Sequence, residues 1–169
     1  LSLAGVTGSL TALDLSSNYL KDEGVSAVCK AIQSNKETKL ATLNFRNNDI
    51  GPVGANALAA MVVVTGSLTS LDLSLNQLCG LDGHGRGTYT ADGITAIADA
   101  LRVNGGLTKL SLAKNKLGEE GTKFICDALF VGNNTLKDLD LSGDDNPFGG
   151  APNIGGTAGA KHVAKMLLV

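Results

Sequence analysis

Apolar residues recur along this chain in one phrase, Leu-x-x-Leu-x-Leu-x-x-Asn-x-Leu. Complete copies, with Phe or Ile replacing some leucines in the second, begin at Leu10, Leu40, Leu68 and Leu107, and a broken fifth copy begins at Leu136. The Leu-x-Leu centre of each copy alternates apolar and polar residues, which is the period of a short strand with one buried face. The phrase therefore predicts five short strands.

A second phrase, which begins with glycine, follows the strand phrase. In 24–32 and 93–101 its apolar residues have helical spacing, so each unit is predicted to run strand, turn, helix. Strands joined by crossover helices pair in parallel, with the helices on one side. Strands lie about 4.8 Å apart and helices about 10 Å apart, so the array must bend with its sheet inside.

The phrases at 92–104 and 117–121 resemble repeats of the ribonuclease-inhibitor-like subfamily of leucine-rich repeat proteins, which includes the NOD-like receptors and the GTPase-activating protein for Ran. The resemblance implies an α/β leucine-rich repeat solenoid, a right-handed horseshoe with a parallel sheet on the concave face and helices on the convex face. It covers nearly all of residues 1–169, a single array of about five units. We expect the array to be a segment of a longer one.

The asparagine of the strand phrase has an expected structural role. Asn18, Asn48, Asn76 and Asn115 occupy this position. A side-chain amide can bond the main chain of the turn where a strand ends. Leaving a buried polar group unpaired costs about 1 to 3 kcal/mol, so these positions should not tolerate leucine.

Two insertions interrupt the repeat, near 79–89 and near 143–158. Both follow the carboxyl end of a strand, so they could meet on one rim, where His84, Arg86 and Tyr89 are candidate partner contacts. Tolerated surface insertions are the alternative. The glycine-rich first insertion lacks the Gly-Lys-Ser/Thr ending of a phosphate loop. The spacing of His84, Asp82, Asp144 and Asp145 specifies no metal site, and we predict no metal and no cofactor.

The solvent-facing strand positions are polar and mildly acidic, which suits a basic partner, although Leu-Asp-Leu-Ser is also a common framework phrase. The candidate partner-binding residues on these strands are Asp14, Ser16, Asn44, Arg46, Asp72, Ser74, Lys109, Ser111, Asp138 and Asp140.

Composition narrows the choice of partners. The net charge of −2 and the absence of a basic stripe argue against nucleic acid, and no apolar run is long enough to span a membrane. Cys29 and Cys126 fall in one helix column three repeats apart, too far for a disulfide. Free thiols are typical of a reducing compartment, so we expect a cytoplasmic protein, with the nucleus as the alternative.

Few residues of the chain are of the kinds that carry out catalysis. The chain has two histidines and no nucleophile motif, so we expect no enzyme but a scaffold that binds a protein partner through the concave sheet and the rim loops. Two alternatives stay open. One is a Ran-type GTPase activator, which acts by completing the site of the GTPase. The other is the ligand-sensing repeat region of a NOD-like receptor. The array ends lack polar capping units and are expected to contact further repeats or another chain.

Overall fold

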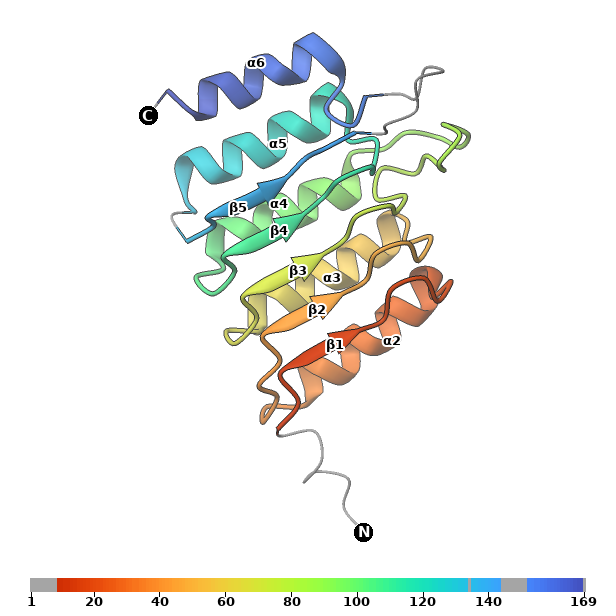
Figure 1. Cartoon of the computed structure of the whole chain (residues 1–169), viewed down its shortest axis with the longest axis vertical. Coiled ribbons are helices and arrows are strands. Elements are labelled where there is room, and N and C mark those ends of the chain that lie inside the picture. The colour runs from red at the N-terminus through yellow and green to blue at the C-terminus, as the bar shows by residue number, and fades with distance from the viewer. Residues whose placement is uncertain (1–8, 134, 144–151, 169) are drawn as a thin grey trace.

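A computed structural model describes residues 9–133, 135–143 and 152–168. Strands and helices alternate along the described chain (Figure 1). The strands are β1 Ala12–Asp14, β2 Thr42–Asn44, β3 Ser70–Asp72, β4 Lys109–Ser111 and β5 Asp138–Asp140, and the helices are α2 Lys21–Ser34, α3 Pro52–Val64, α4 Asp92–Val103, α5 Gly118–Val131 and α6 Gly156–Met166.

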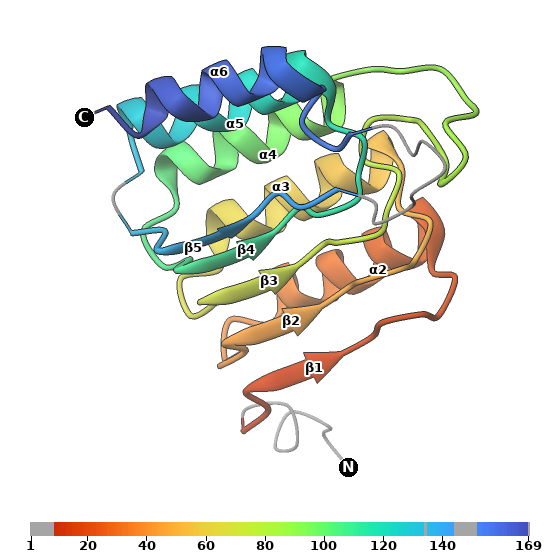
Figure 2. The same cartoon turned by 45° about the horizontal axis from the view of Figure 1, so that its top comes forward.

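The strands form one parallel sheet in the order β1-β2-β3-β4-β5, and the helices lie together on one side of it (Figure 2). The central leucines of the strands align across the whole sheet, because Leu13 pairs with Leu43, Leu43 with Leu71, Leu71 with Leu110 and Leu110 with Leu139. Each helix packs on the next helix along the chain. The predicted α/β leucine-rich repeat solenoid is confirmed.

The core is a stack of thin layers between the sheet and the helices. Leu43, Leu71 and Leu110 are 1 to 2% exposed, and Phe45 is fully buried. Burying each such side chain contributes about 1.5 to 3 kcal/mol, so the layers provide most of the stability. The described cysteines are buried and free, as predicted for Cys29 and Cys126.

The asparagines of the strand phrase join neighbouring repeats. The Asn48 Oδ1 accepts the N–H groups of Asn18 at 3.0 Å and Leu20 at 3.2 Å. Its Nδ2 donates to the carbonyls of Leu15 at 2.9 Å and Phe45 at 3.1 Å. One amide therefore satisfies turn groups of its own repeat and of the preceding repeat.

The turn around these asparagines has left-handed backbone. Asn47 and Asp49, which flank Asn48, both have φ near 55°. Lys114 and Lys116, which flank Asn115, have φ of 58° and 54°. Each non-glycine residue in this region costs about 1 to 2 kcal/mol. The asparagine hydrogen bonds hold the turn in this conformation.

The fifth repeat keeps its asparagine at a displaced position that the sequence analysis did not find. Asn153 is 2% exposed. Its Oδ1 accepts the Asn115 N–H at 2.8 Å, and its Nδ2 donates to the carbonyls of Leu112 at 3.1 Å and Leu141 at 3.0 Å. In this unit the extra residues therefore lie between the strand and the asparagine. Residues 144–151 of the predicted insertion, with Asp144 and Asp145, lie outside the described residues.

Replacing Asn48 with alanine is expected to lower the free energy of unfolding by about 3 kcal/mol, because buried turn groups of two repeats lose their partners. Asn18→Ala is the matched control. Asn18 is exposed, and among the described residues its side chain bonds only within its own turn, so the loss there should stay below about 1 kcal/mol. Urea unfolding followed by circular dichroism measures both, and equal losses would contradict the bridging role of Asn48.

Candidate protein-binding face

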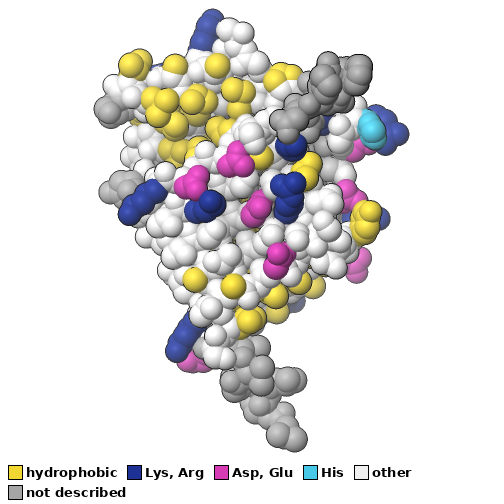
Figure 3. All heavy atoms as spheres, in the orientation of Figure 1, with side chains coloured by type: hydrophobic (Ala, Val, Ile, Leu, Met, Phe, Trp, Pro, Cys, Tyr) yellow, Lys and Arg dark blue, Asp and Glu magenta, His cyan; other side chains and the backbone are white. Residues whose placement is uncertain are grey.

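The strands present their outward side chains on what we call the sheet face. The sheet register aligns Asp14 with Asn44, Asn44 with Asp72, Asp72 with Ser111 and Ser111 with Asp140. We call these five residues the central row. Figure 3 views this face and shows acidic groups near its middle, with lysine and arginine side chains beside them.

Every member of the central row caps the turn that follows its strand. In each case a side-chain oxygen accepts the N–H of the residue two positions later. The bonds are Ser16 to Asp14 at 2.9 Å, Arg46 to Asn44 at 2.9 Å, Ser74 to Asp72 at 2.8 Å, Ala113 to Ser111 at 3.5 Å and Ser142 to Asp140 at 3.0 Å. This is the local Asx or Ser turn, and it fixes the orientation of the side chain.

The caps leave ionised oxygens on the sheet face. The Ser16 N–H lowers the pKa of Asp14, and the Ser142 N–H lowers the pKa of Asp140. Asp72 uses only one oxygen, so its second oxygen has no hydrogen-bond partner among the described residues. The caps fix these side chains before any partner binds. The sheet face therefore offers rigid hydrogen-bond acceptors that lose little further conformational entropy on binding.

The cations of the face are tied to neighbouring strands. The Lys109 Nζ lies 2.8 Å from the Asp138 carboxylate, and this contact raises the pKa of Lys109. Arg46 donates to the Ser74 hydroxyl at 3.0 Å. Ser74 is only 1% exposed, whereas the other strand residues named from the sequence are exposed or half-buried. Ser74 thus supports Arg46 from beneath and offers almost no surface of its own.

The first insertion folds on itself. Leu81 and Gly87 form an antiparallel bridge, and the Asp82 carboxylate accepts the N–H groups of His84 and Arg86, both at 2.9 Å. The Arg86 Nε also lies 2.8 Å from Asp82. His84 and Arg86 are therefore exposed side chains on an internally braced loop.

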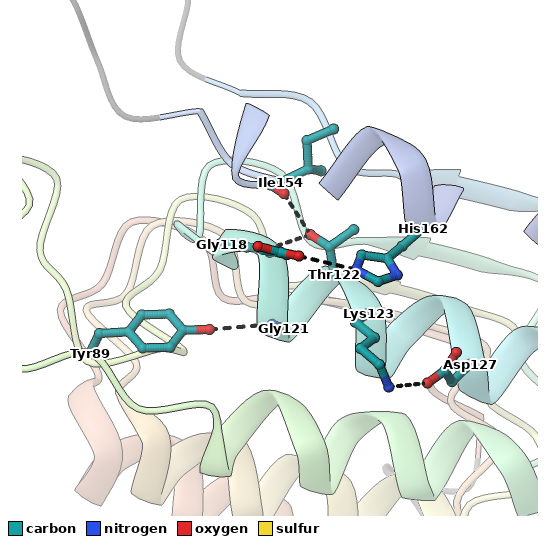
Figure 4. A network of polar contacts seen from close by, with 9 residues as sticks. Tyr89, Gly118, Gly121, Thr122, Lys123, Asp127, Ile154 and His162 are labelled. Atoms are coloured by element: carbon teal, nitrogen blue, oxygen red, sulfur yellow. Dashed lines mark hydrogen bonds and ion pairs between the residues drawn. The ribbon is translucent and has the colours of Figure 1, made fainter. Parts of the chain in front are cut away.

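The two ends of this insertion are anchored in the fold. Cys79 is fully buried. Tyr89 points toward α5 (Figure 4), where its hydroxyl donates to the Leu117 carbonyl at 2.7 Å and accepts the Gly121 N–H at 3.3 Å. Tyr89, named from the sequence as a candidate partner contact, is thus half-buried and braces the loop against the next repeat.

A second network joins α5 to the last repeat (Figure 4). The Thr122 hydroxyl lies 2.7 Å from the Gly118 carbonyl and 3.2 Å from the Ile154 carbonyl. The His162 Nε2 lies 3.6 Å from a Glu119 oxygen. His162 therefore connects α6 to α5 through Glu119.

A second asparagine series lies at the turns between helices and strands, and the sequence analysis missed it. The Asn104 Nδ2 donates to the Val62 carbonyl at 2.8 Å, and the Asn133 Nδ2 donates to the Leu101 carbonyl at 2.7 Å. Both asparagines lie just after a helix, at the end of the recurring helix phrase. This shared position is the signal in the sequence by which the series could have been predicted. They hold the rim opposite to the insertions.

Within the described ranges, no group of three His, Cys, Asp or Glu side chains is placed to hold a metal ion. None of the helices that the structure describes has both the length and the apolar character required to cross a membrane.

Comparison with known proteins agrees with this geometry. The family described as Leucine Rich repeat matches residues 9–29, 36–59 and 67–78. The chain is 29% identical over 158 residues to NACHT, LRR and PYD domains-containing protein 5 of Bos taurus, which covers 80% of this chain and 14% of that protein. It is 30% identical over 155 residues to the ribonuclease inhibitor of Mus musculus, which covers 81% of this chain and 34% of that protein.

Solved structures give the same fold. The leiomodin-1 actin-binding site 2 superposes with a TM-score of 0.68 at 22% identity, over 97% of this chain and 82% of that one. The tropomodulin C-terminal domain of Caenorhabditis elegans superposes with a TM-score of 0.65 at 14% identity, over 98% and 92% of the two chains. At these identities the likeness concerns the fold alone.

The chain is a leucine-rich repeat protein, and this class provides repeat scaffolds for protein interaction. Its repeats are of the ribonuclease-inhibitor-like type, as the relatives and the strand-helix units both show. The chain spans about a third or less of the length of these curated relatives.

Removing one hydroxyl tests the anchor of the insertion. Tyr89→Phe is expected to lower the free energy of unfolding by about 1 to 2 kcal/mol, because the Leu117 carbonyl and the Gly121 N–H lose a partner. Tyr19→Phe is the control, since Tyr19 is 75% exposed. Urea unfolding distinguishes the two, and an unchanged midpoint in Tyr89→Phe would show that the anchor contributes nothing.

Alkaline pH tests the burial of Cys79. Burial raises the pKa of this thiol to about 12 from 9.0. Because the folded pKa lies above the unfolded one, the contribution to stability is complete below pH 9 and is lost as the pH rises toward 12. Between pH 9 and 10, wild type should lose up to about 1.4 kcal/mol more than Cys79→Ala. The urea midpoints of wild type and Cys79→Ala, measured at each pH, show how the stability of each protein changes with pH. The same pH dependence in both proteins would refute the raised pKa of Cys79.

Proposed function

We propose that the chain is a non-catalytic scaffold whose sheet face binds a basic segment of a protein partner. The central row carries this proposal. It holds three carboxylates, Asp14, Asp72 and Asp140, each oriented by a turn cap. A partner that meets oriented acceptors avoids part of the ordering entropy that flexible surface side chains would lose.

The charge of the face supports a basic partner. Lys109 is paired with Asp138, and Arg46 is directed toward Ser74. In the sheet order Asp72 lies between these two cations, and Asp14 and Asp140 lie on the outer strands β1 and β5. Each of these carboxylates uses one oxygen for its cap, and the second oxygen of Asp140 accepts the Ser111 hydroxyl at 3.1 Å. Lysine or arginine side chains of a partner would find charge-assisted hydrogen bonds there, and such bonds are the stronger kind.

The braced loop of residues 82–88 extends the same proposal to the rim. His84 and Arg86 are exposed on it, and Asp82 holds its backbone. Loops fixed on a rigid scaffold are common sites of recognition. We assign this loop a secondary contact that selects among partners engaged by the sheet face.

We also propose that the chain performs no chemistry and acts in the cytoplasm. Among the described residues, His84 and His162 lie in separate environments, and His162 pairs with Glu119. Neither belongs to a nucleophile and base pair of the kind that covalent catalysis uses. Burial raises the pKa of Cys29 and Cys79 to about 12, which keeps both thiols protonated and unreactive.

One alternative has a specific observation in its favour. Several relatives are NACHT, LRR and PYD domains-containing proteins, and six of them match over 76 to 85% of this chain. The ligand-sensing region of a NOD-like receptor is therefore the second candidate. Sequencing the complete transcript would test it, because that alternative requires a nucleotide-binding domain in the same protein. A Ran-type GTPase activator stays a prediction.

Neutralising the central row tests the proposal. The triple variant Asp14→Asn, Asp72→Asn, Asp140→Asn keeps an oxygen for every turn cap and removes three charges. We expect it to weaken binding of basic probe proteins, pancreatic ribonuclease and a lysine-rich peptide, by at least about tenfold, measured by calorimetry at physiological salt.

The matched control removes three charges outside the strands, in α2, in the connection from α2 to β2 and in α4. This variant is Glu23→Gln, Glu37→Gln, Asp92→Asn, and its residues are all exposed. It should bind the probes as wild type does. Equal weakening in both triple variants would mean that only the net charge matters and would reject the sheet face as the site. His84→Ala with Arg86→Ala measures the share of the rim loop.

A further inference from the structure

The turns that follow the helices lie on the rim opposite to the first insertion (Figure 1), and an asparagine bridges two of their junctions. The Asn104 and Asn133 amides donate to carbonyls of the preceding helix. At the junction between α2 and α3 the position of Asn104 is occupied by Thr65, since each is the first residue after its helix. The Thr65 hydroxyl donates to the Met61 carbonyl of its own helix at 2.7 Å. Among the described residues, the Thr65 side chain therefore forms no bridge to α2.

The connection after α2 is also longer than its counterparts. It covers residues 35–41, whereas the connections after α3 and α4 cover residues 65–69 and 104–108. The longer connection and the substituted asparagine meet at the same junction. Two departures from the repeat therefore coincide there.

A groove of about 790 Å³ lies at this junction, and we call it the rim groove. Its volume is within the range of about 300 to 1,000 Å³ that is usual for binding sites. The residues that line it include Ile32, Gln33 and Lys36 after α2 and Val64, Thr65 and Gly66 after α3. Both walls belong to consecutive repeats of the chain, so the rim groove does not depend on what precedes or follows the array.

The surroundings of the rim groove carry net positive charge. Lys36 lines the groove, Lys39 lies in the same connection, and both are exposed. Within the described part of the chain neither lysine forms an ion pair. Glu37 is the one acidic residue of the connection, and α3 has no charged residue. An acidic group that binds here would gain charge-assisted hydrogen bonds.

Apolar surface continues from the rim groove along the ends of the helices. Val64, Val103 and Val131 are the last residues of α3, α4 and α5, and they are 64, 68 and 76% exposed. We call them the valine row. Adjacent helices lie about 10 Å apart, so the row covers about 20 Å. Exposed apolar residues that follow one another in this way mark a contact surface.

We propose that the rim groove and the valine row bind an extended segment of a partner protein that carries acidic side chains next to a run of apolar ones. The acidic side chains pair with Lys36 and Lys39. One apolar side chain enters the rim groove between Ile32 and Val64, and the rest of the run covers the valine row. The site is separate from the sheet face, whose carboxylates favour a partner of the opposite charge. An anionic membrane shares this chemistry, but its flat surface has no group that fills a groove.

A peptide selection with a subtraction step tests the site. A library of random peptides displayed on phage is first depleted on the Gly66→Leu variant and then selected on wild type. Peptides that bind the sheet face also bind this variant and are removed, so the result does not depend on the function proposed for that face. We expect the recovered peptides to be enriched in Asp or Glu beside Leu, Ile, Val or Phe. Recovery of no peptide, or of peptides rich in Lys or Arg, overturns the proposal.

Gly66→Leu fills the rim groove without straining the backbone. A Cβ at Gly66 would have open space within 4 Å, and its φ lies outside the left-handed region. Gly105 is the matched control, because it is also the second residue after its helix and has the same open surroundings, but it does not line the groove. The recovered peptides should bind Gly105→Leu as they bind wild type. Loss of binding to both variants would place the contact outside the rim groove.

The charge is tested by a variant that leaves the rim groove open. Lys36→Gln should weaken the binding of a recovered peptide about two- to fivefold in calorimetry, as the loss of one exposed ion pair allows. Lys161→Gln removes the same charge from an exposed position on α6 and should have no effect. Equal responses of the two variants would overturn the pairing with Lys36.

The valine row is tested in the same assay. Val103→Ser should weaken binding about threefold, because apolar area that the peptide covers is lost. Val53→Ser is the control, since Val53 is 66% exposed at the opposite end of its helix. No effect of Val103→Ser would exclude the valine row from the site. Binding of wild type to phosphatidylserine vesicles, without recovery of any peptide, would assign the rim to a membrane surface and overturn the proposal.

Discussion

The structure depends on the asparagine side chain that follows each strand. A strand of three residues cannot end in a left-handed turn beside the core unless the buried N–H and C=O groups of that turn find partners. One amide supplies them for its own repeat and for the preceding repeat, as Asn48 does. The displaced Asn153 shows how strict this requirement is. The chain accommodates extra residues before the asparagine, and the amide still occupies the same place relative to Asn115 and Leu112.

Side chains on the sheet face also supply hydrogen-bond partners for the turns that follow the strands. The central row uses one side-chain oxygen per residue to cap the turn after the strand. A framework role and a recognition role are therefore not alternatives for these aspartates. The cap that makes Asp72 part of the framework also holds its other oxygen toward solvent in a fixed orientation. Surfaces built in this way offer rigid polar groups, which suits a binding scaffold better than a catalytic site.

Much of the fold could be predicted from the sequence, because each repeat is a local unit with period-two and helical spacing. The candidate site was predictable only in part. The register places the outward residues of the strands as expected, but Ser74 is buried and accepts a hydrogen bond from Arg46 of the preceding repeat. Tyr89 looked like a loop residue, yet its hydroxyl bonds to Leu117 and Gly121, 28 and 32 positions further along the chain. Contacts between repeats of this kind carry no local spacing signal.

The sequence by itself determined the kind of layer, the number of layers and the parallel stacking, since these follow from the alternation of apolar and polar positions within each repeat. The tertiary structure decided which groups remain without partners. Whether an N–H or a leucine is satisfied depends on its neighbour in the adjacent layer, and that neighbour is separated by a whole repeat. This is why Leu43 and Leu139, which stand at equivalent positions in the sequence, differ in exposure.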